Sequence, residues 1–201
     1  MSRYSKARFL RSAGSPAAFG DDSGYEVAIA GRSNSGKSSA LNAILRRDLA
    51  RTSATPGRTQ AVNLFELQPG QRLVDLPGYG HARVPDAVRA AWGRLMDAYF
   101  AGRASLAGLL IVVDARRGFG ERDEAMLQYA AARGIPSRVL LTKSDKLGRN
   151  EARQALSAAQ AALAGRAGVQ LFSATSGEGV DAAQAALEEM LAGHAKTPGD
   201  P

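Results

Sequence analysis

Residues 31–38 combine two glycines, a lysine and a final serine in the order Gly-Arg-Ser-Asn-Ser-Gly-Lys-Ser, which matches the pattern G-x-x-x-x-G-K-[ST]. Groups at this spacing bind phosphates, because backbone amides converge on the anion, the lysine neutralises it and the serine hydroxyl binds Mg²⁺. An apolar run, 26–30, precedes the pattern and a helical stretch follows it. That strand–loop–helix context predicts a binding loop for a nucleoside triphosphate with magnesium.

The roles within this loop follow from residue type. Gly31 and Gly36 permit a close approach of the backbone to phosphate. Lys37 is expected to contact the β- and γ-phosphates, and Ser38 to bind Mg²⁺. The side-chain oxygen of Asn34 either binds a potassium ion between the phosphates, in place of an arginine finger, or caps the local backbone. The predicted nucleotide-binding residues of the loop are Gly31, Arg32, Ser33, Asn34, Ser35, Gly36, Lys37 and Ser38.

An Asp-Leu-Pro-Gly string follows, at residues 75–78. An acid at the carboxyl end of a strand faces the ligand crevice, so Asp75 is expected to hold Mg²⁺ through water. The Gly78 amide is expected to bind the γ-phosphate and to lose that contact on hydrolysis. Leu76 and Pro77 complete this predicted nucleotide-binding string.

Tyr79 occupies the position at which Ras-like enzymes have a glutamine that positions water. A phenol does not orient water as an amide does, so we expect slow intrinsic hydrolysis unless a partner or a cation assists. Nearby His81 is either a base or a solvated loop histidine.

The string Thr142-Lys-Ser-Asp145 follows the apolar residues 139–141 and fits the guanine-specificity pattern [NT]-K-x-D. The Asp145 carboxylate can accept both N1–H and N2–H of guanine, whereas adenine would leave it unpaired. The alternative is a charged surface turn. After the apolar residues 169–172, the amide of Ala174 could bind the guanine carbonyl oxygen. The predicted guanine-binding residues are Thr142, Lys143, Ser144, Asp145, Ser173, Ala174 and Thr175.

The segment Thr55-Pro-Gly-Arg-Thr-Gln60 lies between the loop and Asp75 and is predicted to be switch I, or else an ordinary Gly/Pro loop. Thr59 is preferred to Thr55 as a second magnesium-binding hydroxyl, because Thr55 precedes proline and is driven toward extended geometry. Lys37, Thr59 and Gly78 are the predicted catalytic residues, and Ser38, Thr59 and Asp75 the predicted metal site. Residues Gly57, Arg58, Thr59, Gln60 and Ala61 join the nucleotide-binding set.

Apolar runs that alternate with helical patterns must position these groups. Strands are predicted near 25–30, 61–67, 72–75, 107–113, 138–142 and 168–172, and helices near 37–46, 86–100, 121–133, 150–164 and 180–192. The connection Gln68-Pro-Gly-Gln71 is too short for a parallel crossover, so the strands beside it should be antiparallel. We therefore predict an α/β P-loop GTPase domain: a six-stranded, mostly parallel sheet with one antiparallel strand and helices on both faces.

Composition narrows the class further. The chain has 201 residues, a formal net charge of +7 and no cysteine, which excludes disulfides, thiolate metal sites and cysteine nucleophiles. No apolar run is long enough to span a bilayer. Residues 1–22 are predicted to be a basic extension, 23–192 the GTPase domain and 193–201 a disordered tail. The Arg- and Ser-bearing start also resembles an organellar transit peptide.

With these motifs in this order, the chain resembles the EngB (YihA/YsxC) family of bacterial ribosome-biogenesis GTPases, which belongs with the TrmE-Era-EngA-EngB-Septin-like GTPases. The strings at 31–39, 55–60, 75–80 and 141–147 carry the resemblance, and Thr142 is this family's usual residue; His81 departs from its usual apolar residue. The resemblance implies a cytoplasmic, magnesium-dependent GTPase that binds GTP and GDP, acts in large ribosomal subunit assembly and is linked to normal septation. We expect a monomer without a membrane span.

Two other readings stay open at this point. A metabolic P-loop kinase or ATPase would require ATP preference and an acceptor pocket, whereas a GTP-dependent scaffold for division proteins would need no RNA. The basic charge is compatible with a nucleic-acid or ribonucleoprotein partner. The resemblance implies that this partner is a pre-50S particle and its rRNA. The arginines that could contact rRNA phosphates, each otherwise simply solvated, are Arg32, Arg46, Arg47, Arg51 and Arg58.

Overall fold

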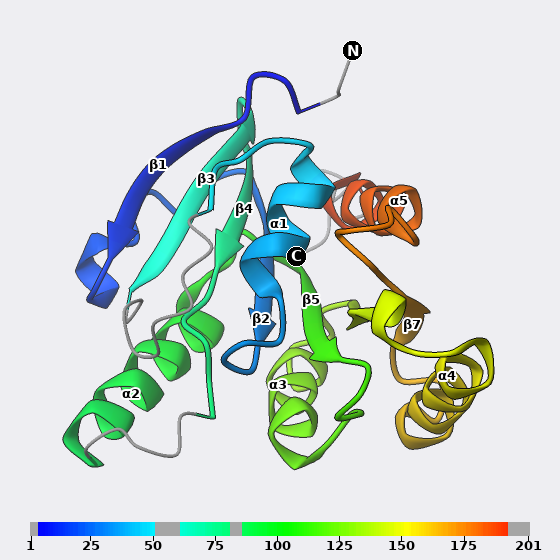
Figure 1. Cartoon of the computed structure of the whole chain (residues 1–201). Coiled ribbons are helices and arrows are strands. Elements are labelled where there is room, and N and C mark those ends of the chain that lie inside the picture. Colours follow the sequence, from blue (N-terminus) through cyan, green and yellow to red (C-terminus); the bar gives the residue numbers. More distant parts are fainter. Residues whose placement is uncertain (1–3, 51–60, 81–85, 193–201) are drawn as a thin grey trace.

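The computed structural model describes residues 4–50, 61–80 and 86–192, with the side chains of 86–89 not described (Figure 1). These residues form one seven-stranded sheet in the order β1–β3–β4–β2–β5–β6–β7. The strands are β1 (Arg8–Ala13), β2 (Tyr25–Gly31), β3 (Val62–Gln68), β4 (Gln71–Asp75), β5 (Leu106–Asp114), β6 (Ser137–Thr142) and β7 (Gly168–Leu171). The α-helices are α1 (Lys37–Leu45), α2 (Asp86–Gly102), α3 (Glu121–Ala131), α4 (Arg149–Leu163) and α5 (Val180–Ala192).

Strand β3 runs against all the other strands. It pairs antiparallel with β1 and β4, whereas β2 pairs parallel with β4 and β5, and β6 pairs parallel with β5 and β7. A tight turn joins β3 to β4, and Gly70 adopts φ +77° in it. The predicted single antiparallel strand and its physical reason, the short connection, are confirmed.

The predicted number of six strands is wrong, because Arg8–Ala13 adds β1 at the edge of the sheet. Most residues of β1 are exposed, so the segment lacks the apolar pattern from which the other strands are predicted. Its place is fixed by pairing with β3, where Arg8 bonds to Glu66 at 2.6 Å and the Ser12 hydroxyl to Asn63 at 2.5 Å. The predicted basic extension, residues 1–22, therefore contains a strand of the sheet.

Two apolar cores cover the two faces of the sheet. Side chains alternate along β5, so Leu109 and Ile111 pack into the cluster that includes α2, α3 and α4. Leu110 and Val112 point to the opposite face and pack with α1 and α5. All nine residues of β5 are buried, as expected for a central strand of a parallel sheet.

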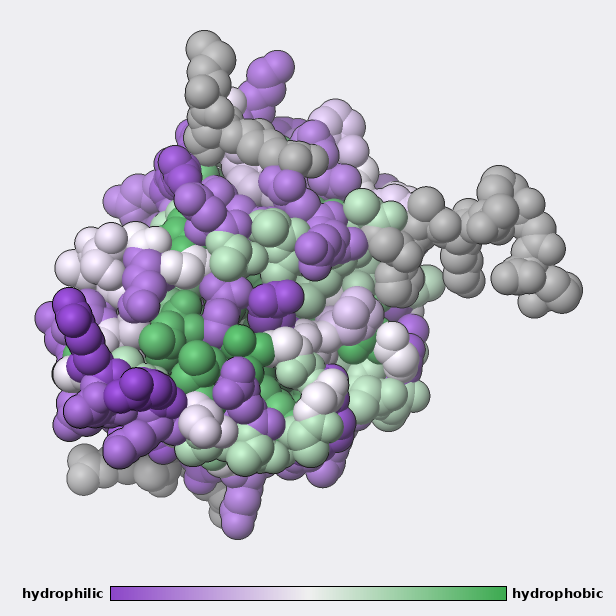
Figure 2. Space-filling view, turned by 90° about the vertical axis from the view of Figure 1, so that its right-hand side faces the viewer, coloured by the Kyte–Doolittle hydropathy of each residue, from purple (hydrophilic) through white to green (hydrophobic). Residues whose placement is uncertain are grey.

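The surface on the side that carries α4, α5 and β7 is mixed. Figure 2 shows a group of apolar residues there, surrounded by hydrophilic ones. Among the large apolar side chains of the described residues, only Phe9 on β1 is clearly exposed, at 50%. Apart from Phe9, the large apolar side chains of the described residues are therefore buried or half-buried.

Candidate functional site

The phosphate-binding loop connects the end of β2 to the start of α1. A Cβ at Gly31 would lie 2.6 Å from the Ser35 hydroxyl and 2.7 Å from the Val112 carbonyl oxygen, so the turn requires glycine there. Gly36, at φ +91°, is the residue before α1. The sequence pattern thus forms the expected tight loop, whose amides lead into a helix N-terminus suited to phosphate.

Lys37 and Asp75 lie in direct contact at the base of this loop. The Lys37 ammonium pairs with one oxygen of the Asp75 carboxylate, and Asn63 donates to the other at 3.5 Å. The Ser38 hydroxyl and Asp75 supply oxygen donors of the kind that Mg²⁺ takes beside phosphates and water. Within residues 4–50, 61–80 and 86–192 no group of three or more His, Cys, Asp or Glu side chains is placed to hold a metal ion.

Thr142 and Lys143 join the guanine-binding segment to the phosphate loop. The Thr142 hydroxyl lies 2.5 Å from the Ser35 carbonyl oxygen and 3.1 Å from that of Val113. Lys143 donates to the Asn34 carbonyl oxygen at 2.7 Å. Thr142 and Lys143 therefore bond directly to the backbone of the phosphate loop, and the two predicted nucleotide-binding segments lie side by side.

Asp145 and Ser173 form the other half of the predicted guanine site. The Ser173 hydroxyl donates to Asp145 at 2.7 Å and accepts the amides of Thr175 and Ser176. This hydrogen bond, followed by the charge of Lys146, lowers the pKa of Asp145. An ionised carboxylate can accept the two N–H groups on one edge of guanine. The fold thus brings two of the predicted guanine-binding residues, Asp145 and Ser173, into contact.

Asp114 is a site residue that the sequence analysis missed. It ends β5, is buried, and accepts Lys143 at 3.0 Å and a two-bond contact from Arg116 at 2.6 and 2.9 Å. Burial acts to raise the pKa of Asp114, but hydrogen bonds from Arg116 and Lys143 hold it well below its usual value. The sequence could have indicated Asp114, because it ends a buried strand just as Asp75 does.

Glu178 is a second residue that the sequence did not indicate, and it is the partner of Ser144. The Ser144 hydroxyl donates to Glu178 at 2.5 Å, and the Ser144 amide donates to the Phe172 carbonyl oxygen at 3.3 Å. These bonds tie the segment after β6 to the loop after β7, so Glu178 helps to hold the two guanine-binding strings together.

Tyr79 is turned inward. It is 6% exposed, and its hydroxyl donates to buried Asp123 on α3 at 2.8 Å. Burial, and then the charge of Asp123, raise the pKa of Tyr79 far above its usual value. Tyr79 therefore remains a phenol whose hydroxyl is occupied by a carboxylate, which agrees with the expectation that it does not act as the glutamine does.

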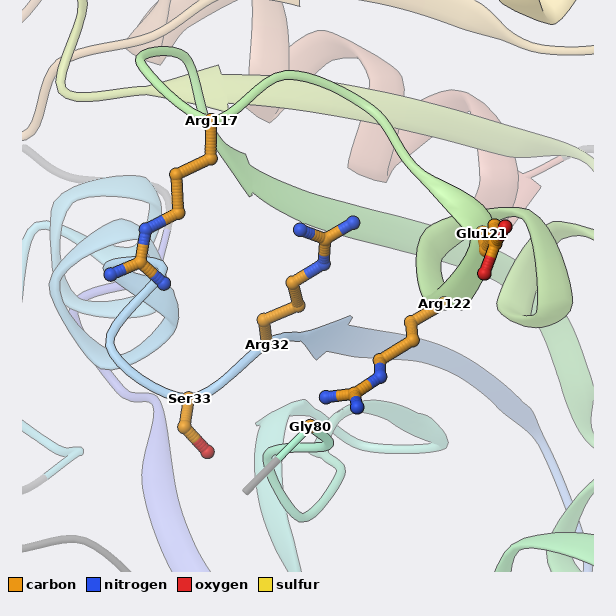
Figure 3. Close-up of a pocket in the computed structure, with 6 residues that line it drawn as sticks. All are labelled: Arg32, Ser33, Gly80, Arg117, Glu121 and Arg122. Carbon is orange, nitrogen blue, oxygen red and sulfur yellow. The ribbon is translucent and has the colours of Figure 1, made fainter. Parts of the chain in front are cut away.

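A polar pocket of about 380 Å³ lies beside the loop (Figure 3). Figure 3 shows the Arg32 side chain extending from the loop between those of Arg117 and Arg122. The Arg32 guanidinium is 2.6 Å from the Asp123 carboxylate, so it is directed toward α3. The lining residues are Arg32, Ser33, Gly80, Arg117, Glu121 and Arg122.

Several predicted residues lie outside the described part of the chain. They are Gly57, Arg58, Thr59 and Gln60 of the predicted switch I, with Thr55 and Arg51, together with His81 and the tail 193–201. Of the arginines assigned to rRNA, Arg46 pairs with Asp181 at 2.6 Å, and Arg47 donates to the Ser5 carbonyl oxygen. Asn34 adopts a left-handed backbone conformation, with φ +62°.

The loop, the acid at the end of β4 and the guanine-binding pair on this sheet define a P-loop GTPase. A family profile described as "50S ribosome-binding GTPase" matches residues 26–143. The chain is 50% identical over 194 residues to the "Probable GTP-binding protein EngB" of Nitrosococcus oceani, covering 94% of this chain and 97% of that protein. The protein of the same description from Xanthomonas euvesicatoria pv. vesicatoria is 48% identical, with 92% of each chain covered. The chain belongs to the EngB family of GTP-binding proteins.

Solved structures agree on the fold. A crystal structure of a probable GTP-binding protein engB has a TM-score of 0.67 at 19% identity, covering 83% of this chain and 98% of that one. Era in complex with MgGDPNP and 16S ribosomal RNA nucleotides has a TM-score of 0.65 at 20% identity, covering 89% and 59%. No helix within the described ranges is long and apolar enough to cross a membrane.

Proposed function

We propose that this protein is a magnesium-dependent GTPase switch that acts in assembly of the large ribosomal subunit and is required for normal cell division and septation. The observation that carries the nucleotide choice is the pairing of Asp145 with Ser173 next to Thr142 and Lys143. The ribosomal role is supported by family membership and by the net charge of +7, which suits an rRNA partner. We further propose a cytoplasmic bacterial monomer.

The residues divide the chemistry among them. Lys37 would bind the β- and γ-phosphates, while Ser38, Thr59 and a water on Asp75 would hold the metal. Bound Mg²⁺ would neutralise charge that develops on the phosphate oxygens. The Gly78 amide binds the γ-phosphate, so switch II responds to hydrolysis. Tyr79 cannot replace the missing glutamine, and intrinsic turnover is slow.

Titration of the purified protein with GDP, GTP and ATP, with and without Mg²⁺, tests the nucleotide assignment. We expect binding of GDP and GTP in the presence of Mg²⁺ and no measurable ATP binding, because ATP would leave Asp145 unpaired. Equal or tighter binding of ATP would refute the guanine assignment and favour a kinase or ATPase.

Co-sedimentation with ribosomal particles tests the partner. The protein should pellet with pre-50S particles in the presence of a non-hydrolysable GTP analogue and much less with GDP. Absence from the pellet in both states would contradict the ribosomal role and favour a scaffold in division.

Asn34 is proposed to bind K⁺ beside the phosphates, supplying positive charge during hydrolysis. Single-turnover hydrolysis should therefore be faster in KCl than in NaCl at equal ionic strength, and Asn34→Ala should abolish the difference. Equal rates in the two salts would refute the potassium site.

A further inference from the structure

The carboxylate of Asp123 connects three segments that are far apart in the sequence. It is fully buried in the first turn of α3 and accepts the Tyr79 hydroxyl on one oxygen at 2.8 Å. Its other oxygen accepts the Arg32 guanidinium at 2.6 Å and the Gly120 amide at 3.0 Å. One buried acid thus contacts the phosphate loop, the string after β4 and the start of α3.

The backbones of these segments are also joined. The Tyr79 amide donates to the Gly31 carbonyl oxygen at 3.2 Å, and the Ser33 amide donates to the Tyr79 carbonyl oxygen at 2.9 Å. Arg32 and Tyr79 consequently form an isolated parallel bridge. A Cβ on Gly78 would lie 3.2 Å from the Ser33 hydroxyl. Gly78, the residue proposed to sense the γ-phosphate, is therefore held directly against the phosphate loop.

These contacts reinforce one another. A buried carboxylate is costly unless it is paired, and Asp123 is paired by one charged and two neutral donors. Gly120 leaves room for this arrangement, since a Cβ there would lie 2.5 Å from the Arg32 guanidinium. Loss of one donor would weaken the hold on the others, because they share a single acceptor.

We propose that Asp123 is a positioning residue which, through Tyr79 and Arg32, holds the Gly78 amide at the place where it meets the γ-phosphate of GTP. The residue that replaces the glutamine of Ras-like enzymes is then an anchor and not a water-positioning group. This inference rests on the proposed GTPase function and deepens it. Because GDP has no γ-phosphate, the anchor favours binding of GTP over GDP.

Two variants test the anchor. Tyr79→Phe removes one hydroxyl and keeps the ring, whose centroid is 6.3 Å from that of Trp92. Asp123→Asn keeps an acceptor for Tyr79 but removes the charge that pairs with Arg32. In each variant the dissociation constant of a fluorescent, non-hydrolysable GTP analogue should rise about five- to tenfold, while that of fluorescent GDP stays within about twofold. The variants that bind the GTP analogue more weakly should also hydrolyse GTP more slowly in single-turnover measurements.

Tyr99→Phe is a matched control. It removes a buried hydroxyl that donates to buried Glu26 at 3.1 Å, and Glu26 keeps its ion pairs with Arg72 and Arg103. We expect a comparable loss of thermal stability and an unchanged ratio of the two dissociation constants.

The outcomes separate this inference from the function on which it rests. Equal weakening of GDP and GTP analogue, or an effect that Tyr99→Phe reproduces, would overturn the positioning role and leave Asp123 purely structural. Failure of the unmodified protein to bind either guanine nucleotide would overturn the proposed function, and this inference with it.

Discussion

Asp145 is the residue on which the proposed recognition of guanine depends. Its carboxylate is held by the Ser173 hydroxyl at 2.7 Å and by Lys146 at 3.3 Å, so it is presented as a fixed, ionised acceptor. Orientation by neighbours matters here, because two parallel hydrogen bonds to one base edge require a fixed plane.

Asp145→Asn should reverse the choice of base. The new amide donates at one of the two positions where the carboxylate accepted. The N2–H of guanine therefore loses its acceptor, and the C2 carbonyl oxygen of xanthine gains a donor. We expect GDP affinity to fall by at least about a hundredfold and xanthosine diphosphate to bind measurably, as followed by nucleotide titration. Asp181→Asn, the same change at an exposed acid on α5, is the control. Unchanged GDP affinity in Asp145→Asn would contradict the assignment.

Asp114 should make stability depend on pH. Its pKa is lowered in the folded protein, so on acidification the unfolded chain binds the proton first. The stabilisation is present above the ordinary carboxyl pKa of about 3.9 and is lost as the pH falls through the lower folded value. Urea unfolding should be measured at pH 7 and at about pH 3. Between these values the free energy of unfolding should decrease less for Asp114→Asn than for the unmodified protein. An equal loss in both proteins would contradict this role.

At the level of elements, β5 and α5 pack so closely that one position needs glycine. A Cβ at Gly108 would lie within 2.7 Å of three side-chain atoms of Met190. In contrast, a Cβ at Gly93 within α2 would have no atom within 4 Å other than its local neighbours. The first glycine is required by helix-to-sheet packing, and the second is not.

The same substitution should therefore have opposite effects at the two sites. Gly108→Ala should lower the free energy of unfolding by about 1–3 kcal/mol through overpacking. Gly93→Ala should raise it by about 0.5–1 kcal/mol, because alanine loses less backbone entropy in a helix. Urea unfolding of both variants measures the two changes in the free energy of unfolding. Changes of the same sign would contradict the packing described for β5 and α5.

For the whole molecule, the net charge of +7 predicts that the proposed binding to ribosomal particles depends on salt. Counterion release should lower that affinity by more than about tenfold when salt rises from about 50 to about 200 mM. Replacement of Arg46 and Arg47 by alanine should make the salt dependence shallower by about two units of logarithmic slope. The matched control is alanine at Arg149 and Arg153, which are exposed on α4. A salt-independent affinity would refute the electrostatic contribution.

Much of this molecule follows from its sequence. The strands β2 to β7 and the five helices lie close to their predicted ranges, because apolar periodicity and turn residues are local signals. The phosphate loop and the guanine-binding strings were likewise recognisable, since each is a short run of residues whose spacing reflects one ligand. Strand β1 was not predicted, because its position in the sheet depends on pairing with β3 and not on a local apolar pattern.

What only the tertiary structure decided are the contacts between distant residues. Sequence identified Tyr79 as an unusual residue, but the fold placed its hydroxyl on Asp123, which lies 44 positions away. The same holds for Asp114, whose role appears only when Lys143 lies beside it. Local patterns determine which groups the chain offers to a nucleotide, whereas buried charges must find partners wherever the folded chain brings donors within hydrogen-bond distance.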